Sequence, residues 1–210
     1  MEAYIKIKNI SKKINKNIIL DDISIDLYKG KIYGFRGING SGKTMLFRAI
    51  CGLISLSSGE IIIDGKKLHD EISFPQSVGA LIENPGFLPN YSGKENLKFI
   101  ANINEIIKNE DIDKVLTLVG LDHKDNRKFK EYSLGMKQKL GIAQALMENP
   151  DLIILDEPTN ALDEESVKNI LNIIKEEKRK NKIILISSHD KSILEEISDE
   201  IINIENGKIV

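Results

Sequence analysis

The segment GINGSGKT, residues 37–44, carries the first residues of this sequence with an evident chemical use. A glycine, four residues and then Gly-Lys-Thr form the spacing of a phosphate-binding loop, between the strand pattern KIYGF and the helical pattern TMLFRAICGL. Glycines let backbone N–H groups close around phosphates, while the lysine reaches the β and γ phosphates and the threonine hydroxyl binds Mg²⁺. A glycine-rich turn with an incidental lysine is the plainer alternative, and the flanking elements argue against it. The predicted nucleotide-binding residues are Gly37, Asn39, Gly40, Ser41, Gly42, Lys43 and Thr44.

A second group of polar residues follows another apolar strand pattern, in LIILDEPTNALD, residues 152–163. Asp156 closes the strand and is predicted to hold Mg²⁺, whereas Glu157 is predicted to polarise the attacking water. Two adjacent carboxylates can also form an ordinary solvated turn, but the phosphate-binding loop in the same chain favours catalysis. His189 follows the apolar strand KIILISS, where it could sense a phosphate or cap the helix that begins near Asp190.

The stretch YSLGMKQKLGIAQAL, residues 132–146, is typical of the start of a helix. Ser133 is a good N-cap and Gly135 leaves the first turn open, so the helix presents backbone N–H groups and a positive end. These features make half of an anion site, although Lys43 already serves the phosphates from the other side. The sequence therefore suggests that Ser133 and Gly135 serve a nucleotide held by a second subunit.

Strand patterns that alternate with helical patterns predict an α/β fold with a mainly parallel central sheet. The short apolar runs KIYGF, VGALI, DLIILD and KIILIS are expected in that sheet, while ISIDLY (23–28) and the hairpin EIIIDGK predict an N-terminal antiparallel layer. A polar, helical stretch with a Ser92–Glu95 capping box and a C-terminal Gly120 lies between them. We expect one domain over 1–210, with a P-loop NTPase core at about 1–83 and 151–210 and an inserted helical subdomain at about 84–150.

Composition narrows the classes of protein further. The formal net charge of −2 is spread along the chain, which argues against a nucleic-acid binder. The sequence predicts neither a secretory signal in MEAYIKIKNI nor an apolar run of the roughly 18 residues that span a bilayer. Cys51, in the apolar helical setting LFRAICGL, is predicted to pack in the core rather than to react.

Four segments in this order, GINGSGKT, YSLGMKQ, LIILDEPTNALD and SSH, resemble the nucleotide-binding subunit of an ATP-binding cassette (ABC) transporter over the whole chain. The resemblance implies ATP and Mg²⁺ as ligands and a head-to-tail dimer that encloses two ATP molecules. It implies that Ser133 and Gly135 contact the γ-phosphate of the ATP held by the opposite subunit. It also implies that Asp163 lies at the dimer seam and that His189 is the switch histidine.

Three positions depart from the pattern of this family. The usual signature Leu-Ser-Gly-Gly-Gln is here YSLGM, residues 132–136, which keeps the contacting serine and glycine. Glu83 stands where most members have a glutamine, and it is predicted to contact Mg²⁺ or water. The family's adenine-stacking aromatic is missing near Ile14, because the sequence has no aromatic residue between Tyr4 and Tyr28.

The resemblance implies an ATP-hydrolysing subunit, either a homodimer or paired with a paralogous ATPase subunit. We expect it to bind no nucleic acid and to lie in the cytoplasm, on the inner face of the membrane through a separate permease. The loop 84–97, with Phe87, Leu88 and Tyr91 expected to be exposed, faces that permease by resemblance or packs on the subdomain.

The pairing of LIENPGF with SLGMKQ is similar to exporters of bacitracin-like and lantibiotic-like peptides, which implies export of a drug or antimicrobial peptide. The alternative is a soluble ABC ATPase of assembly or repair. A non-catalytic scaffold is disfavoured, because Lys43, Asp156 and Glu157 are all present.

Overall fold

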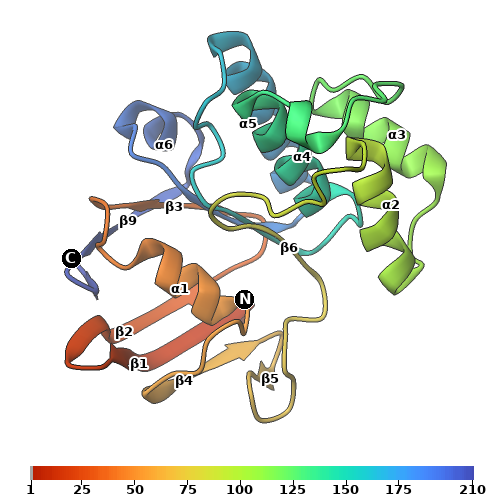
Figure 1. The fold of residues 1–210 in the computed structure, drawn as a ribbon. Helices are drawn as coiled ribbons and strands as arrows, with labels where there is room; N and C mark the ends of the chain where they lie inside the picture. The colour runs from red at the N-terminus through yellow and green to blue at the C-terminus, as the bar shows by residue number, and fades with distance from the viewer. Residues whose placement is uncertain (1) are drawn as a thin grey trace.

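The computed structural model describes residues 2–210, which form two sheets with helices between and above them (Figure 1). The strands are β1 (Ile5–Ile14), β2 (Asn17–Leu27), β3 (Ile32–Arg36), β4 (Ser58–Ile63), β5 (Lys66–Lys67), β6 (Val78–Leu81), β7 (Leu152–Leu155), β8 (Ile183–Ser187), β9 (Glu200–Glu205) and β10 (Lys208–Ile209). The helices are α1 (Lys43–Ile50), α2 (Gly93–Asn104), α3 (Asn109–Leu118), the 3₁₀ turn η1 (Phe129–Glu131), α4 (Leu134–Leu146), α5 (Glu164–Arg179) and α6 (Lys191–Ile197).

The central sheet has six strands in the order β10-β9-β3-β8-β7-β6, and every pairing from β9 to β6 is parallel. Its central strands β3, β7 and β8 are buried on both faces, because successive side chains enter two different cores. In β7, for example, Ile154 packs toward α1 and the antiparallel sheet, while Ile153 and Leu155 pack toward α4 and α5. The predicted α/β fold with a mainly parallel central sheet is confirmed.

The second sheet is antiparallel, in the order β2-β1-β4-β5, and forms the expected N-terminal layer below α1 (Figure 1). The turn between β4 and β5 is made by Asp64 and Gly65, both in the left-handed region, as the sequence predicts. β1 was not predicted, because its alternation is interrupted: Asn9 has φ 47° and the pairing with β2 shifts register. The hairpin of β9 and β10 was also missed, although Asn206 and Gly207 form its turn.

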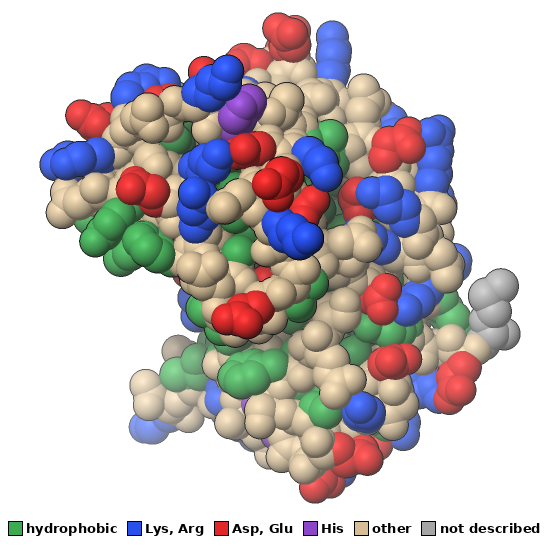
Figure 2. All heavy atoms as spheres, turned by 90° about the vertical axis from the view of Figure 1, so that its right-hand side faces the viewer, with side chains coloured by type: hydrophobic (Ala, Val, Ile, Leu, Met, Phe, Trp, Pro, Cys, Tyr) green, Lys and Arg blue, Asp and Glu red, His purple; other side chains and the backbone are tan. Residues whose placement is uncertain are grey.

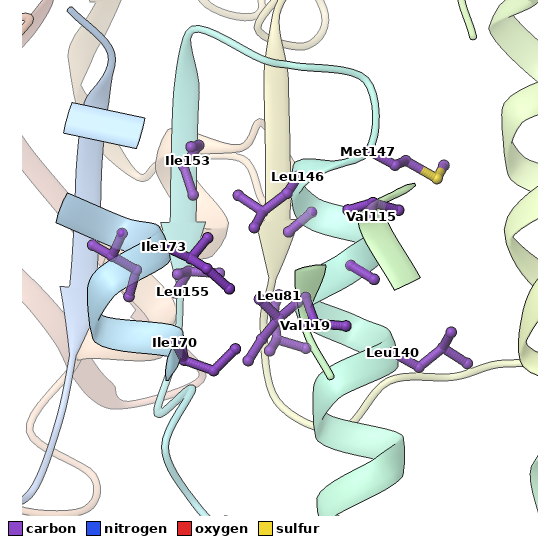
Figure 3. Close-up of a cluster of buried hydrophobic side chains, with 14 of the residues drawn as sticks. Leu81, Val115, Val119, Leu140, Leu146, Met147, Ile153, Leu155, Ile170 and Ile173 are labelled. Carbon is purple, nitrogen blue, oxygen red and sulfur yellow. The ribbon is translucent and has the colours of Figure 1, made fainter. Parts of the chain in front are cut away.

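The stretch between β6 and β7 contains α2, α3, η1 and α4, as the sequence predicts. Ser92 and Glu95 form the capping box of α2, and Gly120 follows α3 with φ 77°. α4 packs directly on β6, where a side chain at Gly79 would collide with the carbonyl oxygen of Ala145. Figure 3 shows the resulting core, with Leu81 between α4 and the α5 residues Ile170 and Ile173. The C-terminal half of α4 therefore shares the sheet's core, and the boundaries of the helical subdomain remain a prediction.

Two simpler expectations can also be compared with the structure. Across residues 2–210, the helices are too short or too polar to cross a bilayer. Cys51 is 5% exposed, and burial raises the pKa of its thiol to about 12. A thiol with so high a pKa is a poor nucleophile, which confirms the packing role.

Candidate nucleotide site

The loop 37–44 joins β3 to α1 and has the conformation that its glycines permit. Gly40 and Gly42 have φ values of 78° and 113°, and Gly42 is the N-cap of α1. Lys43 is 6% exposed and its Nζ donates hydrogen bonds to the carbonyl oxygens of Gly37, at 2.6 Å, and Ile38, at 3.2 Å. The buried Ser41 Oγ has no hydrogen-bond partner within residues 2–210. The loop thus combines an ammonium, a helix N-terminus and an unsatisfied hydroxyl, a set of groups that suits phosphate oxygens.

Asp156 lies at the end of β7 and is held by two hydroxyl groups. Thr44 Oγ1 donates to its Oδ2 at 2.7 Å, and Ser187 Oγ donates to its Oδ1 at 2.6 Å. The carboxylate is buried, with 5% of the residue exposed. The contact with Thr44 joins two chain segments that are 112 residues apart, because β3 and β7 end at the same edge of the parallel sheet.

Glu157 follows Asp156 with a left-handed backbone, φ 51°, which is unusual for a residue with a side chain. Its N–H donates to Ser187 Oγ at 2.9 Å, and its side chain is 16% exposed. Burial raises the pKa of the Glu157 carboxyl, while His189 and Lys43 oppose that rise. A carboxylate with a raised pKa is a better proton acceptor, as general-base chemistry requires.

His189 lies beside this carboxylate. Its backbone N–H donates to Glu157 Oε2 at 3.1 Å, and its Nε2 lies 3.1 Å from Oε1. The alternative that His189 caps the next helix is wrong, since Asp190 is the N-cap of α6 and accepts from Ser192 N at 2.8 Å. The imidazole is thus available to the Glu157 carboxylate and to a ligand beside it.

These groups surround one cavity of about 260 Å³. Its lining residues are Ile19, Asn39, Gly40, Ser41, Gly42, Lys43, Thr44, Met45, Asp156, Glu157 and His189. A second cavity, of about 490 Å³, shares His189 with the first and is also lined by the loop residues Gly37 and Ile38. The structure therefore brings together most of the predicted phosphate, metal and catalytic residues.

Ser133, Gly135 and Asp163 do not line these cavities in their own chain, as far as residues 2–210 are concerned. Ser133 is the N-cap of α4, accepts from Met136 N at 3.2 Å, and is exposed, which confirms the predicted cap. Gly135 lies against another loop, because a Cβ there would be 2.9 Å from the carbonyl oxygen of Ala161. Asp163 is exposed and caps α5 by accepting from Ser166 N at 2.8 Å.

Glu83 also lies apart from the cavity. Its Oε2 accepts from Arg48 of α1 at 2.8 Å, its side chain is 55% exposed, and its φ is 58°. The side chain therefore pairs with an arginine, and its contact with Mg²⁺ or water remains a prediction.

Two polar residues of this region were not predicted. Ser187 bridges the two carboxylate residues, and Gln138 of α4 donates from Nε2 to the Glu157 carbonyl oxygen at 2.9 Å. Ser187 could have been found as the polar end of a buried strand next to His189. Gln138 gives no such signal, because a glutamine on a helix is usually solvated.

The segment 84–97, expected to be a loop, differs partly from expectation, since its residues 93–97 are the first turn of α2. Leu88 and Tyr91 are exposed, at 49% and 42%, but Phe87 is half-buried. The Phe87 ring meets the ring of Phe129 edge-on, with centroids 5.2 Å apart. The expectation that Phe87 is exposed is therefore wrong, because the aromatic pair gives it a packing partner.

The site contains oxygen donors that suit a hard divalent cation. The Thr44 hydroxyl and the Asp156 carboxylate lie side by side, 2.7 Å apart. Within residues 2–210, no group of three or more His, Cys, Asp or Glu side chains forms an all-protein metal cage. Mg²⁺ ordinarily binds through one or two protein oxygens with substrate phosphates and water, so these residues fit it.

Fold and site together define a P-loop nucleotide-binding protein. The ABC transporter family model matches residues 20–160. Over 205 residues, the chain is 45% identical to the ABC transporter ATP-binding protein YybJ of Bacillus subtilis (strain 168), covering 98% of this chain and 94% of YybJ. The chain therefore belongs to the ABC transporter family, and within it to the ATP-binding ATPase subunits.

Other relatives are described by what they transport. The bacitracin transport ATP-binding protein BcrA of Bacillus licheniformis is 40% identical, over 100% of this chain and 69% of its own. The lantibiotic transport ATP-binding protein SrtF of Streptococcus pyogenes is 38% identical, over 98% and 89%. A solved ATP-binding subunit of an ABC transporter has 26% identity and a TM-score of 0.89, over 98% of this chain and 88% of that one.

Proposed function

We propose that this chain binds and hydrolyses Mg-ATP in a head-to-tail dimer and thereby drives a separate membrane subunit. The proposal depends chiefly on one observation, the convergence of Lys43, Thr44, Asp156, Glu157 and His189 around one cavity. An ammonium, a hydroxyl, two carboxylates and an imidazole at one sheet edge are the groups that phosphoryl transfer to water requires.

Each side chain has a distinct role in this proposal. Lys43 binds the β and γ phosphates, and the glycines of its loop let backbone N–H groups approach them. Glu157 accepts the proton of the attacking water, and His189 keeps that carboxylate facing the γ-phosphate. Thr44 and Asp156 would hold Mg²⁺. When bound, Mg²⁺ would neutralise phosphate charge and hold the β and γ phosphates in register.

The dimer would complete the site. The exposed N-terminus of α4, with Ser133 and Gly135, is an anion-binding surface that its own cavity does not use, as far as residues 2–210 show. In a two-fold arrangement this surface would contact the ATP of the opposite subunit, with Asp163 at the seam. The second subunit is a copy of this chain or a paralogous ATPase.

The membrane partner would dock beside the segment 84–97 and the adjoining part of α2. Leu88 and Tyr91 of this segment and Phe99 of α2 are exposed, and the rings of Tyr91 and Phe99 meet edge-on at 4.9 Å. Figure 2 shows the face seen from the α2 and α3 side, where hydrophobic side chains lie on both sides of a notch. Exposed apolar groups of this kind are typical of a protein contact. The contact would hold the chain on the cytoplasmic face of the membrane.

The transported substance is proposed from the relatives. BcrA and SrtF are described as transport proteins for bacitracin and lantibiotics, so we infer that this chain energises export of a drug or antimicrobial peptide. A soluble ABC ATPase of assembly or repair is the less favoured alternative, because the relatives reported above are described as transporter subunits.

The decisive experiment replaces Glu157 with glutamine. This change keeps the shape but removes the base, so ATP turnover should fall by roughly 10² to 10⁴-fold while ATP still binds. Gel filtration with ATP should then show a stabilised dimer. Glu110→Gln, at the exposed start of α3, is the matched control and should retain normal turnover. Near-normal hydrolysis by Glu157→Gln would remove this residue from the mechanism.

A further inference from the structure

The segment after β7 has a backbone that needs support. Glu157 and Ala161 are both in the left-handed region, with φ values of 51° and 61°. Residues with side chains rarely adopt this conformation, and they persist in it only where surrounding groups hold them. The orientation of the Glu157 carboxylate therefore depends on what fixes the peptide groups on either side of it.

On one side the central sheet supplies the support. The Glu157 N–H donates to Ser187 Oγ of β8 at 2.9 Å, and the same hydroxyl donates to Asp156. On the other side, α4 supplies it through Gln138, whose Nε2 donates to the Glu157 carbonyl oxygen at 2.9 Å. Asn160 N donates to the same carbonyl oxygen at 3.2 Å, within the segment itself.

A second contact joins the same two segments. A Cβ at Gly135 would lie 2.9 Å from the carbonyl oxygen of Ala161, so α4 approaches the segment closely there. Residues 135 and 138 are three apart in a helix and therefore share a face. One face of α4 thus contacts both left-handed residues, one by close approach and the other by a hydrogen bond.

We propose that Gln138 is a positioning residue for Glu157. It fixes the carbonyl end of the Glu157 backbone from the helical region, while Ser187 fixes the N–H end from the sheet. Gln138 lies five residues after Ser133 on the same helix, about 7.5 Å along its axis. Any displacement of the α4 N-terminus is therefore transmitted to the backbone that carries the carboxylate. This inference rests on the proposed role of Glu157 as general base.

The test compares Gln138→Leu and Gln138→Glu, which both remove the donor, with Gln144→Leu on the same helix. Gln144 is also half-buried, and it lies about 240° around the helix axis from Gln138. Loss of one neutral hydrogen bond should lower kcat by about threefold to tenfold. KM for ATP should stay unchanged, because the phosphate-binding residues are untouched. The Gln144 control should keep the kcat of the unmodified chain.

Combination with Glu157→Gln separates positioning from a structural effect. If Gln138 acts through Glu157, then Gln138→Leu should cause no further loss of the residual hydrolysis of Glu157→Gln. Melting curves would show whether each single variant is folded. If Gln138→Leu does not fold, Gln138→Glu provides the measurement instead. Unchanged kcat in both Gln138 variants, or losses that multiply with that of Glu157→Gln, would overturn the inference. Near-normal activity of Glu157→Gln alone would instead overturn the proposed function.

Discussion

The cavity beside the phosphate-binding loop, of about 260 Å³, is lined by that loop and by residues that follow β7 and β8. Among the described residues, those of α4 do not line it. If Ser133 of a second subunit completes the wall, two inactive variants with defects in different halves should complement each other.

The two variants are Ser133→Arg, which fills the start of α4 with a bulky side chain, and Lys43→Ala, which removes the phosphate-binding ammonium. Each should be inactive alone. In a mixed two-fold dimer both defects fall in one site, which leaves the other site intact. Random pairing makes about half of the dimers mixed, each with one of two sites whole, so mixing should restore at most roughly a quarter of the activity.

The assay measures ATP hydrolysis and trapped nucleotide in equal mixtures of the two variants. Trapped nucleotide is included because, if turnover requires both sites, mixed dimers would occlude one ATP without hydrolysing it. ATP binding by monomeric Ser133→Arg checks that the variant is folded. If mixed dimers form but show neither activity nor trapped nucleotide, the shared site is refuted.

Three further predictions follow from other parts of the structure. The sequence has no aromatic residue between Tyr4 and Tyr28 to stack on adenine, and a stacked ring is worth about 0.5 to 1.5 kcal/mol, so competition binding should place GTP within about tenfold of ATP. Glu177→Gln leaves the buried Lys182 ammonium without its carboxylate partner. This change should lower the free energy of unfolding by about 3 to 5 kcal/mol and Tm by roughly 6 to 20 °C in calorimetry. Leu88→Ala with Tyr91→Ala should spare ATP hydrolysis of the isolated chain but prevent co-purification with the membrane subunit, and intact co-purification would contradict the docking surface.

Much of the site could be predicted because parallel strands end at one edge of a sheet. Asp156, His189 and the loop that leads to Thr44 each follow a short apolar run, and runs of that kind are buried central strands. Their convergence therefore follows from the fold class, without knowledge of any distance. The N-cap at Ser133 was predictable for a local reason, since a helix start depends on a few neighbouring residues.

The remainder depends on contacts between distant segments, which local patterns do not encode. The partner of Glu83 is Arg48 of α1. In the sequence, Arg48 is simply a charged residue in a helical pattern, and nothing there indicates this contact. Gln138 is equally inconspicuous until α4 is placed against the segment after β7. Phe87 appeared to be an exposed loop aromatic because its partner, Phe129, lies 42 residues further along the chain.

The Glu83–Arg48 pair also bears on how a glutamate can replace the family's usual amide. An added carboxylate near the phosphates would repel them, but here its charge is paired with a guanidinium on the helix that follows the phosphate-binding loop. Both side chains are more than a third exposed, at 55% and 36%, and such pairs contribute only about 0 to 1 kcal/mol. The ion pair therefore holds the Glu83 side chain beside Arg48 only weakly. A contact this weak can be exchanged for another, as the proposed contact of Glu83 with Mg²⁺ or water would require.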